Sequence, residues 1–597
     1  MGGNLVEVAI FLEINPFVKI MTLFNTIEKM IPRRFRYPIK VFVLRLFVRI
    51  NFLNQRKLFQ SKLTRLIKYA DAEKVFDDFC TVNSPYWEKL DRLESSPVIL
   101  VEGFLAEYGP NYLMRTGIIT KALEKVSDAR PVILLVHGTK EEPYKRKLYE
   151  SFKVFECVGI YDDIYARLTV LKKILIGILT RFYFHYSEFL FLFGRGESFI
   201  KLSFRGIQIG DMLYDEMIKE CQKGKYTVRY IVRDHYYLFK KTFVYFFALD
   251  ELCRKFNIKY YVSTHSQYIT YGLLLRYFYH KDIVCIETTD DQVFIHNELF
   301  VPRYHMAMHK MIADQLPAIL QNEDLLQQAK SELESRFAGK IEQIDAQLAY
   351  GGKQIYTKQD LKLKINIQND NPIVFIFAHI FSDTPRGSSE NLLFMDFYQW
   401  LLETLRHVRT IKNVNWIVKP HPSVKPYNEE GKVEEVVHKF KGKNSSIYVC
   451  PSDFSTAGLI GSADAITTCQ GTVGLEYSCV GIPTVLAGSP FYSGFGFTSE
   501  PKSKKEYFDV LGDVGCLKPL SLDQIKTALA VYMGFKNVFS TDYTFIDTVL
   551  KSRVWGHDEE PDALGAYALM MDRLKKNDPK KSLLYDTIIN SFSKKEN

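Results

Sequence analysis

The chain has 597 residues, of which 47% are hydrophobic and 25% are charged, and its formal net charge at pH 7 is +9. This composition is typical of a globular protein rather than a disordered one, and at this length it predicts two or three domains. No apolar run reaches the ~18 residues needed to span a bilayer, so we expect no transmembrane helix. We also expect no secretory signal peptide, because residues 1–12 lack the basic start of such a segment.

The nine cysteines are scattered along the chain and form neither a CxxC pair nor a Cys/His cluster. This spacing supports neither a disulfide framework nor a zinc site. A reduced, cytosolic compartment is therefore the simplest expectation.

Basic residues dominate the segment 18–69, in which Glu28 is the only acidic residue. We expect residues 1–95 to form a basic helical region whose amphipathic part carries a stripe of Arg45, Arg49 and Arg56. Such a helix can lie in the headgroup region of an anionic membrane. The alternative is a helix packed on the protein with solvated arginines. Nucleic acid is disfavoured as a partner, because no binding module accompanies the charge.

Short apolar runs that end in polar loops recur between residues 96 and 317. We expect strands at Val98–Val101, Val132–Val136, Tyr230–Val232, Tyr260–Ser263 and Ile283–Ile286. Buried strands separated by helix-length segments predict a parallel α/β sheet, here a first Rossmann-like domain over 96–317. The aromatic segment Leu168–Phe193 is expected to form a helix, and the core is favoured over a membrane-facing surface for it.

The same pattern returns after a charged, helical connection at 318–370. A second Rossmann-like domain is expected over 371–540, followed by helices and a Lys-rich tail over 541–597. Its strands are expected at Ile373–Phe377, Trp416–Val418, Ser446–Val449, Ala465–Thr468 and Thr484–Leu486. The fold class is therefore α/β, with two Rossmann-like domains facing each other across a cleft.

The loop Gln470-Gly471-Thr472 joins the expected strand 465–468 to a helix. Backbone N–H groups and a helix N-terminus at the carboxyl edge of a parallel sheet form a common site for anionic ligands. Gly471 lets the backbone approach a phosphate, and Glu476, one turn into the helix, is placed to accept hydrogen bonds from sugar hydroxyls. An ordinary turn without a ligand is the alternative.

A second polar loop, Lys419-Pro420-His421-Pro422-Ser423, directly follows the expected strand Trp416–Val418. Its two prolines hold the segment extended. A fixed cation, an imidazole and a hydroxyl in such a segment suit contact with a phosphate or a carboxylate. The alternative is a structural turn with an exposed histidine.

These two loops, KPHPS (419–423) and QGTVGLEYSCVGIP (470–483), resemble the C-terminal half of bacterial capsule and lipopolysaccharide polysaccharide-biosynthesis glycosyltransferases. That broad family includes transferases that use CMP-linked Kdo. Three further segments fit the same family: GIQIGDMLYD (206–215), AHIFSDTPRG (378–387) and AGSPFYSGFGFT (487–498). The resemblance covers about 98–507 and implies a GT-B-like fold with glycosyltransferase activity. It does not identify the sugar.

The resemblance also implies roles for individual residues of the second domain. Lys419, His421 and Ser423 would contact the phosphate or sugar acid of the donor, Gln470, Gly471 and Thr472 would surround the phosphate, and Glu476 would hold the ribose. His379 and Asp383, in the loop after the strand Ile373–Phe377, complete the expected donor-binding set. Fixed dipoles and cations of this kind neutralise a departing nucleotide. We therefore expect neither a metal nor another cofactor, and Asp290-Asp291 only loosely resembles a metal-binding pair.

The catalytic base or nucleophile is expected in the first domain, because a carboxylate must take a proton from the acceptor or attack the anomeric carbon. The candidates are Asp211, Glu102, Asp234 and His137. An N-cap of a helix Met212–Glu220 is the alternative role for Asp211. His265 is expected to be structural.

The expected function is transfer of a sugar from a nucleotide-sugar donor, such as CMP-Kdo, to a surface polysaccharide or a lipid-linked glycan. The expected location is the cytoplasmic face of the cell membrane, with peripheral attachment. One alternative is a polyol-phosphate transferase of the teichoic-acid type with a CDP-linked donor, which the segments IGDMLYD and AHIFSDTP disfavour. The other is an inactive scaffold of a polysaccharide-synthesis complex on the membrane.

Overall fold

The computed structural model describes residues 72–593, except 105–108, 140–141, 222–225, 289–292, 297–303, 339–356, 389–390, 426, 442–445 and 538–562. The chain divides into two units, Met1–Glu73 and Lys74–Asn597, and the second contains all the secondary structure described below except residues 72–73. The expected basic stripe of Arg45, Arg49 and Arg56 and the Asp290-Asp291 pair lie outside the described residues.

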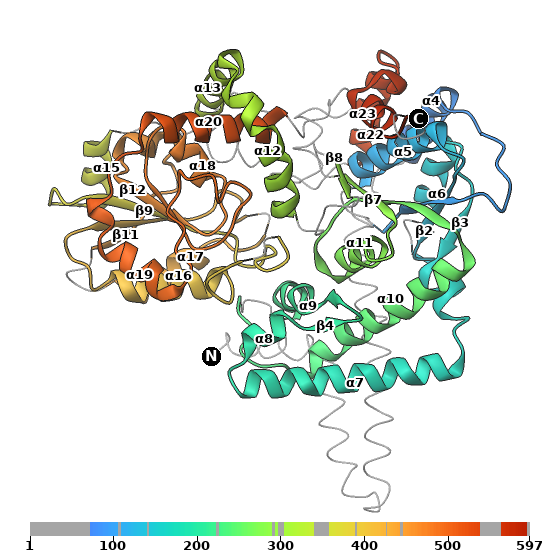
Figure 1. Ribbon diagram of the computed structural model, residues 1–597, viewed down its shortest axis with the longest axis horizontal. Coiled ribbons are helices and arrows are strands. Elements are labelled where there is room, and N and C mark those ends of the chain that lie inside the picture. The colour runs from blue at the N-terminus through green and yellow to red at the C-terminus, as the bar shows by residue number, and fades with distance from the viewer. Residues whose placement is uncertain are drawn as a thin grey trace, which may run out of the picture. The chain divides into compact units, whose positions relative to one another are not determined.

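A first sheet of six strands occupies the N-terminal half of the second unit (Figure 1). Its order is β3-β2-β1-β6-β7-β8, with every neighbouring pair parallel except β7 and β8. The strands are β1 (Val98–Glu102), β2 (Arg130–Leu135), β3 (Cys157–Gly159), β6 (Ile258–Ser263), β7 (Val284–Thr288) and β8 (Val293–His296).

Helices cover both faces of this sheet, because alternate strand residues enter different cores. In β1, Val98 and Leu100 pack into the core that contains α9 (Gly210–Glu216), α10 (Tyr236–Lys255) and α11 (Leu273–Tyr279). Ile99 and Val101 pack into the core that contains α4 (Ala72–Asn83), α5 (Gly109–Val126) and α6 (Glu142–Ser151). The C-terminal helices α22 (Ala563–Leu574) and α23 (Leu583–Ser593) return to this second core and pack on α5.

The expected strand Tyr230–Val232 is wrong, because this segment has no strand pairing and leads instead into a short 3₁₀ turn, Arg233–His235. Two strands of the main sheet were not expected. The strand β3 has only three residues, and the antiparallel β8 lies directly after β7. A small hairpin of β4 (Ser203–Phe204) and β5 (Ile207–Gln208) lies outside the main sheet.

A second sheet, fully parallel, follows in the order β11-β10-β9-β12-β13. Its strands are β9 (Ile373–Phe377), β10 (Asn415–Lys419), β11 (Ile447–Val449), β12 (Ala465–Thr468) and β13 (Thr484–Leu486). One face carries α16 (Phe397–Val408), α17 (Lys432–His438) and α19 (Lys504–Gly512), and the other carries α15 (Lys358–Ile365) and α18 (Val473–Ser478). The expectation of an α/β fold built on two parallel sheets is thus confirmed.

Three further helices pack together. Two of them lie between the two sheets in the sequence, and the third follows the second sheet. They are α12 (Tyr304–Leu320), α13 (Glu323–Phe337) and α20 (Leu522–Asn537). The connecting helix α13 is partly buried, since Leu326, Ala329 and Leu333 pack into a core.

The segment Leu168–Phe193 forms the helix α7 (Val170–Leu192), followed by α8 (Gly196–Ile200). The preference for a core position is only half right. One side of α7 packs on α10, but the opposite side is exposed. No helix of the described part of the chain is both long and apolar enough to span a bilayer.

Candidate functional site

The side chain of His379 joins two loops at the carboxyl edge of the second sheet. β9 ends two residues before His379, and β12 ends two residues before Gln470. The backbone N–H of Gln470 donates to Nε2 of His379 over 3.1 Å, and Oγ1 of Thr468 lies 3.1 Å from the same nitrogen. Because Nε2 accepts the amide hydrogen, the neutral ring carries its proton on Nδ1.

The surroundings of His379 keep its ring neutral. The ring stacks on Phe397 with centroids 4.2 Å apart. Burial, with smaller effects from His421 and His305, lowers the pKa of His379 to about 3. His379 therefore orients the loop Gln470-Gly471-Thr472 and supplies no positive charge to it.

Lys419 and His421 have different surroundings although they belong to one loop. Lys419 is buried at the end of β10, and its Nζ donates to the carbonyl oxygen of Phe454 over 3.0 Å. Burial lowers the pKa of Lys419. His421 is half-buried, and its Nδ1 accepts the backbone N–H of Ser423 over 3.2 Å, which leaves Nε2 to carry the proton of the neutral ring.

The glycines of the second loop are required by close packing. A Cβ atom on Gly471 would lie 3.0 Å from Oγ1 of Thr468, and one on Gly474 would lie 2.2 Å from the hydroxyl oxygen of Tyr492. That hydroxyl donates to the carbonyl oxygen of Gly471 over 2.5 Å. The segment AGSPFYSGFGFT, which contains Tyr492, thus fixes the loop that precedes α18. Thr472 is half-buried at the start of that helix.

Glu476 and Asp383 lie at two other places of the second domain. Glu476 on α18 is buried, and its Oε1 accepts from Nε of Arg336 on α13 over 2.7 Å. Asp383 is half-buried in the loop after β9. Burial raises the pKa of Tyr268 in the first domain, and the charge of Asp383 adds to that effect. The two segments therefore approach each other at this point.

Polar groups also gather at the carboxyl edge of the first sheet. Glu102 ends β1, Ser263 ends β6 and is paired in register with Glu287 of β7, so three neighbouring strands end here. Both carboxylate oxygens of Glu102 have partners. One accepts from the backbone N–H of Phe104, and the other accepts from the hydroxyl of Thr264.

Glu287, which was not among the expected catalytic residues, has an unused oxygen. Its Oε2 lies 3.1 Å from Nε2 of His296, whereas its buried Oε1 has no hydrogen-bond partner among the described residues. The same holds for Nδ1 of His265 and Oγ of Ser266. A buried polar group without a partner costs roughly 1–3 kcal/mol, so three of them at one sheet edge mark a place that a ligand would complete.

The ring of His265 lies between two tyrosines, 5.5 Å from Tyr112 and 5.3 Å from Tyr271 by their centroids. Burial lowers the pKa of His265, and the charge of Glu287 works in the opposite direction. The sequence signal for Glu287 was its position at a strand end, shared with Glu102. That one of its oxygens has no partner among the described residues depends on tertiary contacts, which a sequence does not show.

Asp211 is not an N-cap. The helix α9 begins at Gly210, its N-cap position is Ile209, and Asp211 lies inside the first turn. Its buried carboxylate forms a bidentate ion pair with Arg276 of α11, in which both N···O distances are 2.9 Å. Asp234 is exposed in the 3₁₀ turn before α10.

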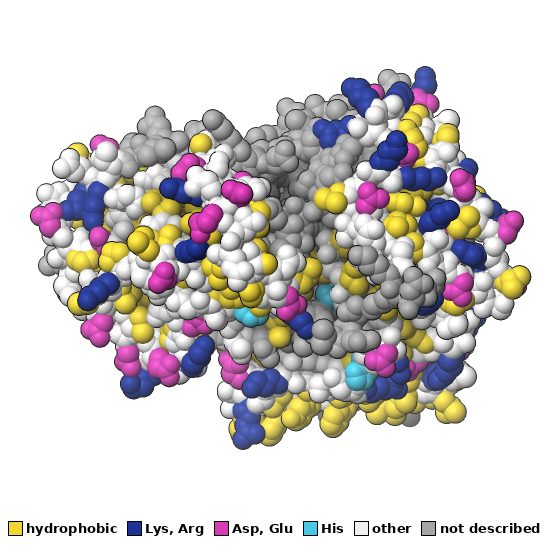
Figure 2. Space-filling model, turned by 45° about the horizontal axis from the view of Figure 1, so that its top comes forward, with side chains coloured by type: hydrophobic (Ala, Val, Ile, Leu, Met, Phe, Trp, Pro, Cys, Tyr) yellow, Lys and Arg dark blue, Asp and Glu magenta, His cyan; other side chains and the backbone are white. Residues whose placement is uncertain are grey.

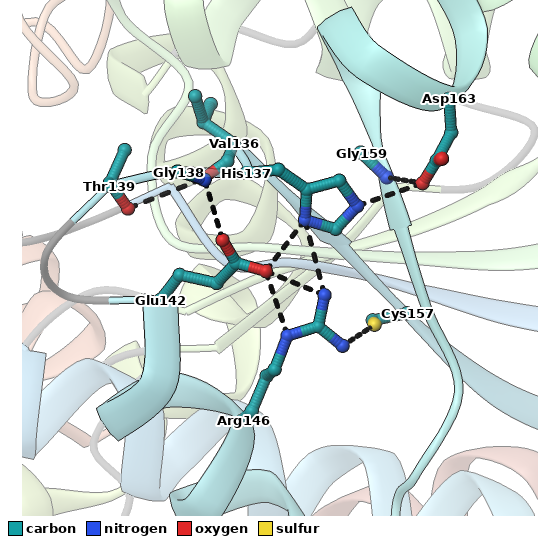
Figure 3. Close-up of polar contacts among 9 residues, drawn as sticks. All are labelled: Val136, His137, Gly138, Thr139, Glu142, Arg146, Cys157, Gly159 and Asp163. Atoms are coloured by element: carbon teal, nitrogen blue, oxygen red, sulfur yellow. Dashed lines mark hydrogen bonds and ion pairs between the residues drawn. The ribbon is translucent and has the colours of Figure 1, made fainter.

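His137 lies between two carboxylates at the end of β2 (Figure 3). Its Nδ1 is 2.7 Å from Oε1 of Glu142, and its Nε2 is 2.8 Å from Oδ2 of Asp163. Burial opposes the charge on the ring, but the hydrogen bonds to Asp163 and Glu142 prevail and raise the pKa of His137. Arg146 binds Glu142 as well, over 2.6 and 2.8 Å. His137 thus connects three segments of the first domain, and neither ring nitrogen is left to act as a base.

Two of the sequence segments that suggested the family meet in the structure. Asp215 of GIQIGDMLYD accepts the backbone N–H groups of Arg386 and Gly387 of AHIFSDTPRG, over 3.1 and 2.6 Å. Next to it, the hydroxyl of Tyr214 donates to Asp396 over 2.6 Å. Asp215 was missed as a key residue, because a sequence does not show which backbone its carboxylate binds.

Within the described residues, no group of three or more His, Cys, Asp or Glu side chains is arranged to hold a metal ion.

Residues 362–508 match the family described as "Capsule polysaccharide biosynthesis protein". No curated protein matches the chain. Among solved structures, KpsC of Thermosulfurimonas dismutans, titled as a beta Kdo 2,7 transferase, is 17% identical, with 50% of this chain and 84% of that chain covered and a TM-score of 0.30.

Two other solved structures illustrate the range of matches. The C-terminal domain of the group 1 glycosyl transferase LpcC of Francisella tularensis is 14% identical, covering 33% of this chain and 98% of that one, with a TM-score of 0.19. A UDP-GlcNAc 2-epimerase of Neisseria meningitidis is 10% identical, covering 73% and 96%, with a TM-score of 0.22.

The sequence match and the site coincide. The span 362–508 contains all the expected donor-binding residues, from His379 to Glu476, and all five strands of the second sheet. The family match, to proteins described as "Capsule polysaccharide biosynthesis protein", thus falls on the part of the chain that carries the candidate donor-binding loops.

Proposed function

We propose that this protein is a glycosyltransferase of capsule polysaccharide synthesis that takes its sugar from a nucleotide-sugar donor. The observation that carries the proposal is the joined pair of loops at the carboxyl edge of the second sheet, inside the family segment. There His379 accepts the N–H of Gln470, and the hydroxyl of Tyr492 donates to the carbonyl oxygen of Gly471, so both contacts hold the same loop in place. A loop held in place at a helix N-terminus, at the carboxyl edge of a parallel sheet, suits a phosphate.

The donor is held by different kinds of groups in this proposal. Nε2 of His421 carries a proton that it donates to a phosphate or sugar-acid oxygen, and Gln470, Gly471 and Thr472 contribute amide and hydroxyl groups. Lys419, whose ammonium is buried against Phe454, contributes positive potential from beneath the loop. These fixed charges and dipoles stabilise the leaving nucleotide without reorganisation, and we propose that no metal is needed.

We further propose Glu287 as the carboxylate that takes part in the transfer. Three of the expected candidates are engaged: Asp211 by Arg276, Glu102 by Phe104 and Thr264, and His137 by Glu142 and Asp163. The fourth, Asp234, is exposed in a 3₁₀ turn and not at a strand end. Glu287 alone of these combines a strand-end position with a buried oxygen that lacks a partner in the described part of the chain. As a base, that oxygen would accept the proton of the acceptor hydroxyl.

The function is tested by incubating the protein with CMP-, UDP-, GDP- and CDP-linked donors and measuring nucleotide release, with and without EDTA. We expect release from one nucleotide class, CMP-Kdo being the first to test, and the same rate in EDTA. His421→Ala and Gln470→Ala should each lower turnover by about 100-fold or more, since a lost donor to a developing anion is typically worth roughly 2.7–4 kcal/mol.

Other outcomes of the same panel identify the alternatives. Transfer from a CDP-polyol only would make the protein a polyol-phosphate transferase of the teichoic-acid type. Absence of nucleotide binding by calorimetry would favour an inactive scaffold. Loss of activity in EDTA would overturn the metal-independent scheme.

We also propose that the protein acts at the cytoplasmic face of an anionic membrane, where a lipid-linked acceptor would be found. The basic residues of the segment 18–69 support this location. Reversing the charge of Arg45, Arg49 and Arg56 to Glu should then weaken binding to anionic vesicles, and unchanged binding would overturn a role for this stripe.

A further inference from the structure

The helix α7 is apolar on two opposite sides, and described residues of the chain pack on only one of them. Its buried side chains, Ile176, Thr180, Phe184, Ser187 and Leu190, pack against the core of the first domain. A helix that is apolar all round is normally buried or in contact with lipid. The outer side of α7 therefore requires an explanation.

Large hydrophobic side chains line that outer side. The exposed fractions are 78% for Leu171, 53% for Ile174, 55% for Ile178, 62% for Phe182, 49% for Phe189 and 80% for Leu192. At 100° per residue these positions fall within an arc of roughly 80°, so they form a single stripe along the helix. Figure 2 shows a row of hydrophobic side chains along the lower edge of the molecule, where Figure 1 places α7.

Basic residues accompany this stripe. Between residues 169 and 205 the sequence has six Lys or Arg residues and two Glu residues. Both acids are engaged, Glu188 with His185 at 2.7 Å and Glu197 with Arg386 at 3.1 Å. Arg181, Arg195 and Lys201 are exposed beside the stripe or just beyond its end. An apolar, aromatic stripe with basic neighbours matches the boundary between headgroups and acyl chains of an anionic bilayer.

The size of the stripe favours a membrane over a second copy of the chain. The 23 residues of α7 extend over ~34 Å, and a stripe one helix wide covers on the order of 340 Å². Each partner of a standard protein–protein interface buries about 800 Å². Because a bilayer is a continuous apolar layer, it requires no matching surface beyond this stripe.

We propose that the outer face of α7 lies in the surface layer of an anionic membrane, parallel to it, and holds the first domain there. This is independent of the proposed sugar transfer, because vesicle binding requires neither donor nor acceptor. It is also separate from the basic segment 18–69, which the variants below leave intact.

The test is co-sedimentation of the full chain with vesicles of phosphatidylcholine alone and of phosphatidylcholine mixed with phosphatidylglycerol. The α7 variant combines Leu171→Ser, Ile178→Ser, Phe182→Ser and Phe189→Ser. The matched control combines Leu363→Ser and Leu522→Ser, which are 80% and 85% exposed in the C-terminal part of the chain. We expect stronger binding to the anionic vesicles, a loss of at least about tenfold in the partition coefficient for the α7 variant, and no change for the control.

A second measurement does not depend on polar substitutions. In the Phe182→Trp protein, brominated lipids should quench the tryptophan fluorescence more than in the wild type. In the Leu363→Trp protein they should not. Equal vesicle binding by the α7 variant and the wild type, absence of wild-type binding, or absence of extra quenching at position 182 would each overturn the proposal. A wild-type dimer that the α7 variant converts to monomers, without any effect on vesicle binding, would assign the stripe to a second copy instead.

Discussion

At the scale of single side chains, the carboxylates of the first domain differ in how many hydrogen bonds they already make. Asp211 receives two bonds from Arg276, while one oxygen of the buried Glu287 receives none from the described residues. Both oxygens of Asp211 thus already accept hydrogen bonds inside the fold. A buried oxygen without a partner is instead available to a proton of the substrate.

The first prediction concerns Glu287→Gln, which keeps the shape of the side chain and removes its basicity. Turnover, measured as nucleotide release in the presence of acceptor, should fall by about 10²–10⁴-fold, the usual contribution of general acid–base catalysis. The affinity for the donor, measured by calorimetry, should stay unchanged, because the donor-binding loops belong to the other sheet. Full turnover by a well-folded Glu287→Gln protein would refute the assignment.

The second prediction concerns Asp211→Asn. Breaking a buried ion pair by neutralising one partner leaves the other charge uncompensated, which typically costs about 3–5 kcal/mol. We expect a clear drop in the denaturation midpoint of the Asp211→Asn protein, measured by urea unfolding. Exchanging Asp250, which is less buried and also pairs with an arginine, for Asn should cost less. Equal stability of wild type and Asp211→Asn would contradict the structural role of this pair.

Sequence reasoning at this scale identified places better than roles. It found the strand ends that carry Glu102, His379 and Gln470, because polar residues after buried runs are visible in a sequence. It gave Asp211 a catalytic role or, as the alternative, the N-cap of a helix from Met212, but the helix begins two residues earlier, at Gly210, and the carboxylate faces Arg276. The partner lies 65 positions along the chain, and no local pattern points to it.

At the scale of elements, His137 holds together the end of β2, the helix α6 and the turn that follows β3. Glu142 begins α6 and also accepts the backbone N–H of Gly138 over 2.7 Å. Asp163 accepts the N–H of Gly159 at the end of β3 over 2.7 Å. This connection needs a protonated ring and two ionised carboxylates, so it depends on pH.

The sign of that dependence follows from the pKa shifts. The pKa of His137 is raised from 6.5, so its stabilising effect is complete below that value and is lost as the pH rises through the raised pKa. Against the effect of burial, Arg146 and Gly138 lower the pKa of Glu142 from 4.5, and Gly159 and His137 lower that of Asp163 from 3.8. The carboxylates therefore contribute above those values and lose their effect as the pH falls further.

The third prediction is that His137→Gln lowers the melting temperature most between about pH 4.5 and 6.5, and progressively less at higher pH. The measurement is thermal unfolding of both proteins over a pH series. His185→Gln is the matched control, since His185 also pairs with a carboxylate at 2.7 Å but its side chain is 69% exposed. A His137→Gln difference that is constant over the whole series would contradict the charged connection.

The strands of the second sheet were predictable because each is a short, nearly continuous apolar run, as parallel strands buried on both faces must be. The expected Ala465–Thr468 and Thr484–Leu486 coincide with β12 and β13. Tyr230–Val232 failed because three residues carry too little pattern to separate a strand from an extended segment before a turn. The outer side of α7 was mistaken for core, since an apolar helix reads the same in sequence whether protein or another medium covers it.

At the scale of the whole molecule, the two sheets belong to one unit, Lys74–Asn597, and the segments GIQIGDMLYD and AHIFSDTPRG help to join them. Asp215 is fully buried and receives N–H groups of Arg386 and Gly387 from the other half of that unit. Burial raises the pKa of Asp215 well above its ordinary value, although those two N–H groups act in the opposite direction. The packing at Gly387 is tight, because a Cβ atom there would lie 2.9 Å from Oδ2 of Asp215. These residues therefore hold the donor-binding half and the proposed catalytic half together, rather than binding substrate.

The last prediction is that weakening this junction uncouples the unfolding of the two sheets. Asp215→Ala removes the acceptor of two buried N–H groups, and each unpaired group costs roughly 1–3 kcal/mol, while the core of each sheet stays intact. We expect one calorimetric transition for the wild type and two for Asp215→Ala, since each sheet has its own hydrophobic core. Tyr214→Phe, which removes the bond to Asp396 across the junction, should act in the same direction but less strongly. Tyr277→Phe removes a similar hydroxyl–carboxylate bond, 2.8 Å to Asp250, inside the first domain, so it should lower the transition temperature without separating the transitions. If Asp215→Ala unfolds in one transition at a lower temperature, the two sheets are coupled mainly by other contacts, and the segments GIQIGDMLYD and AHIFSDTPRG have another role.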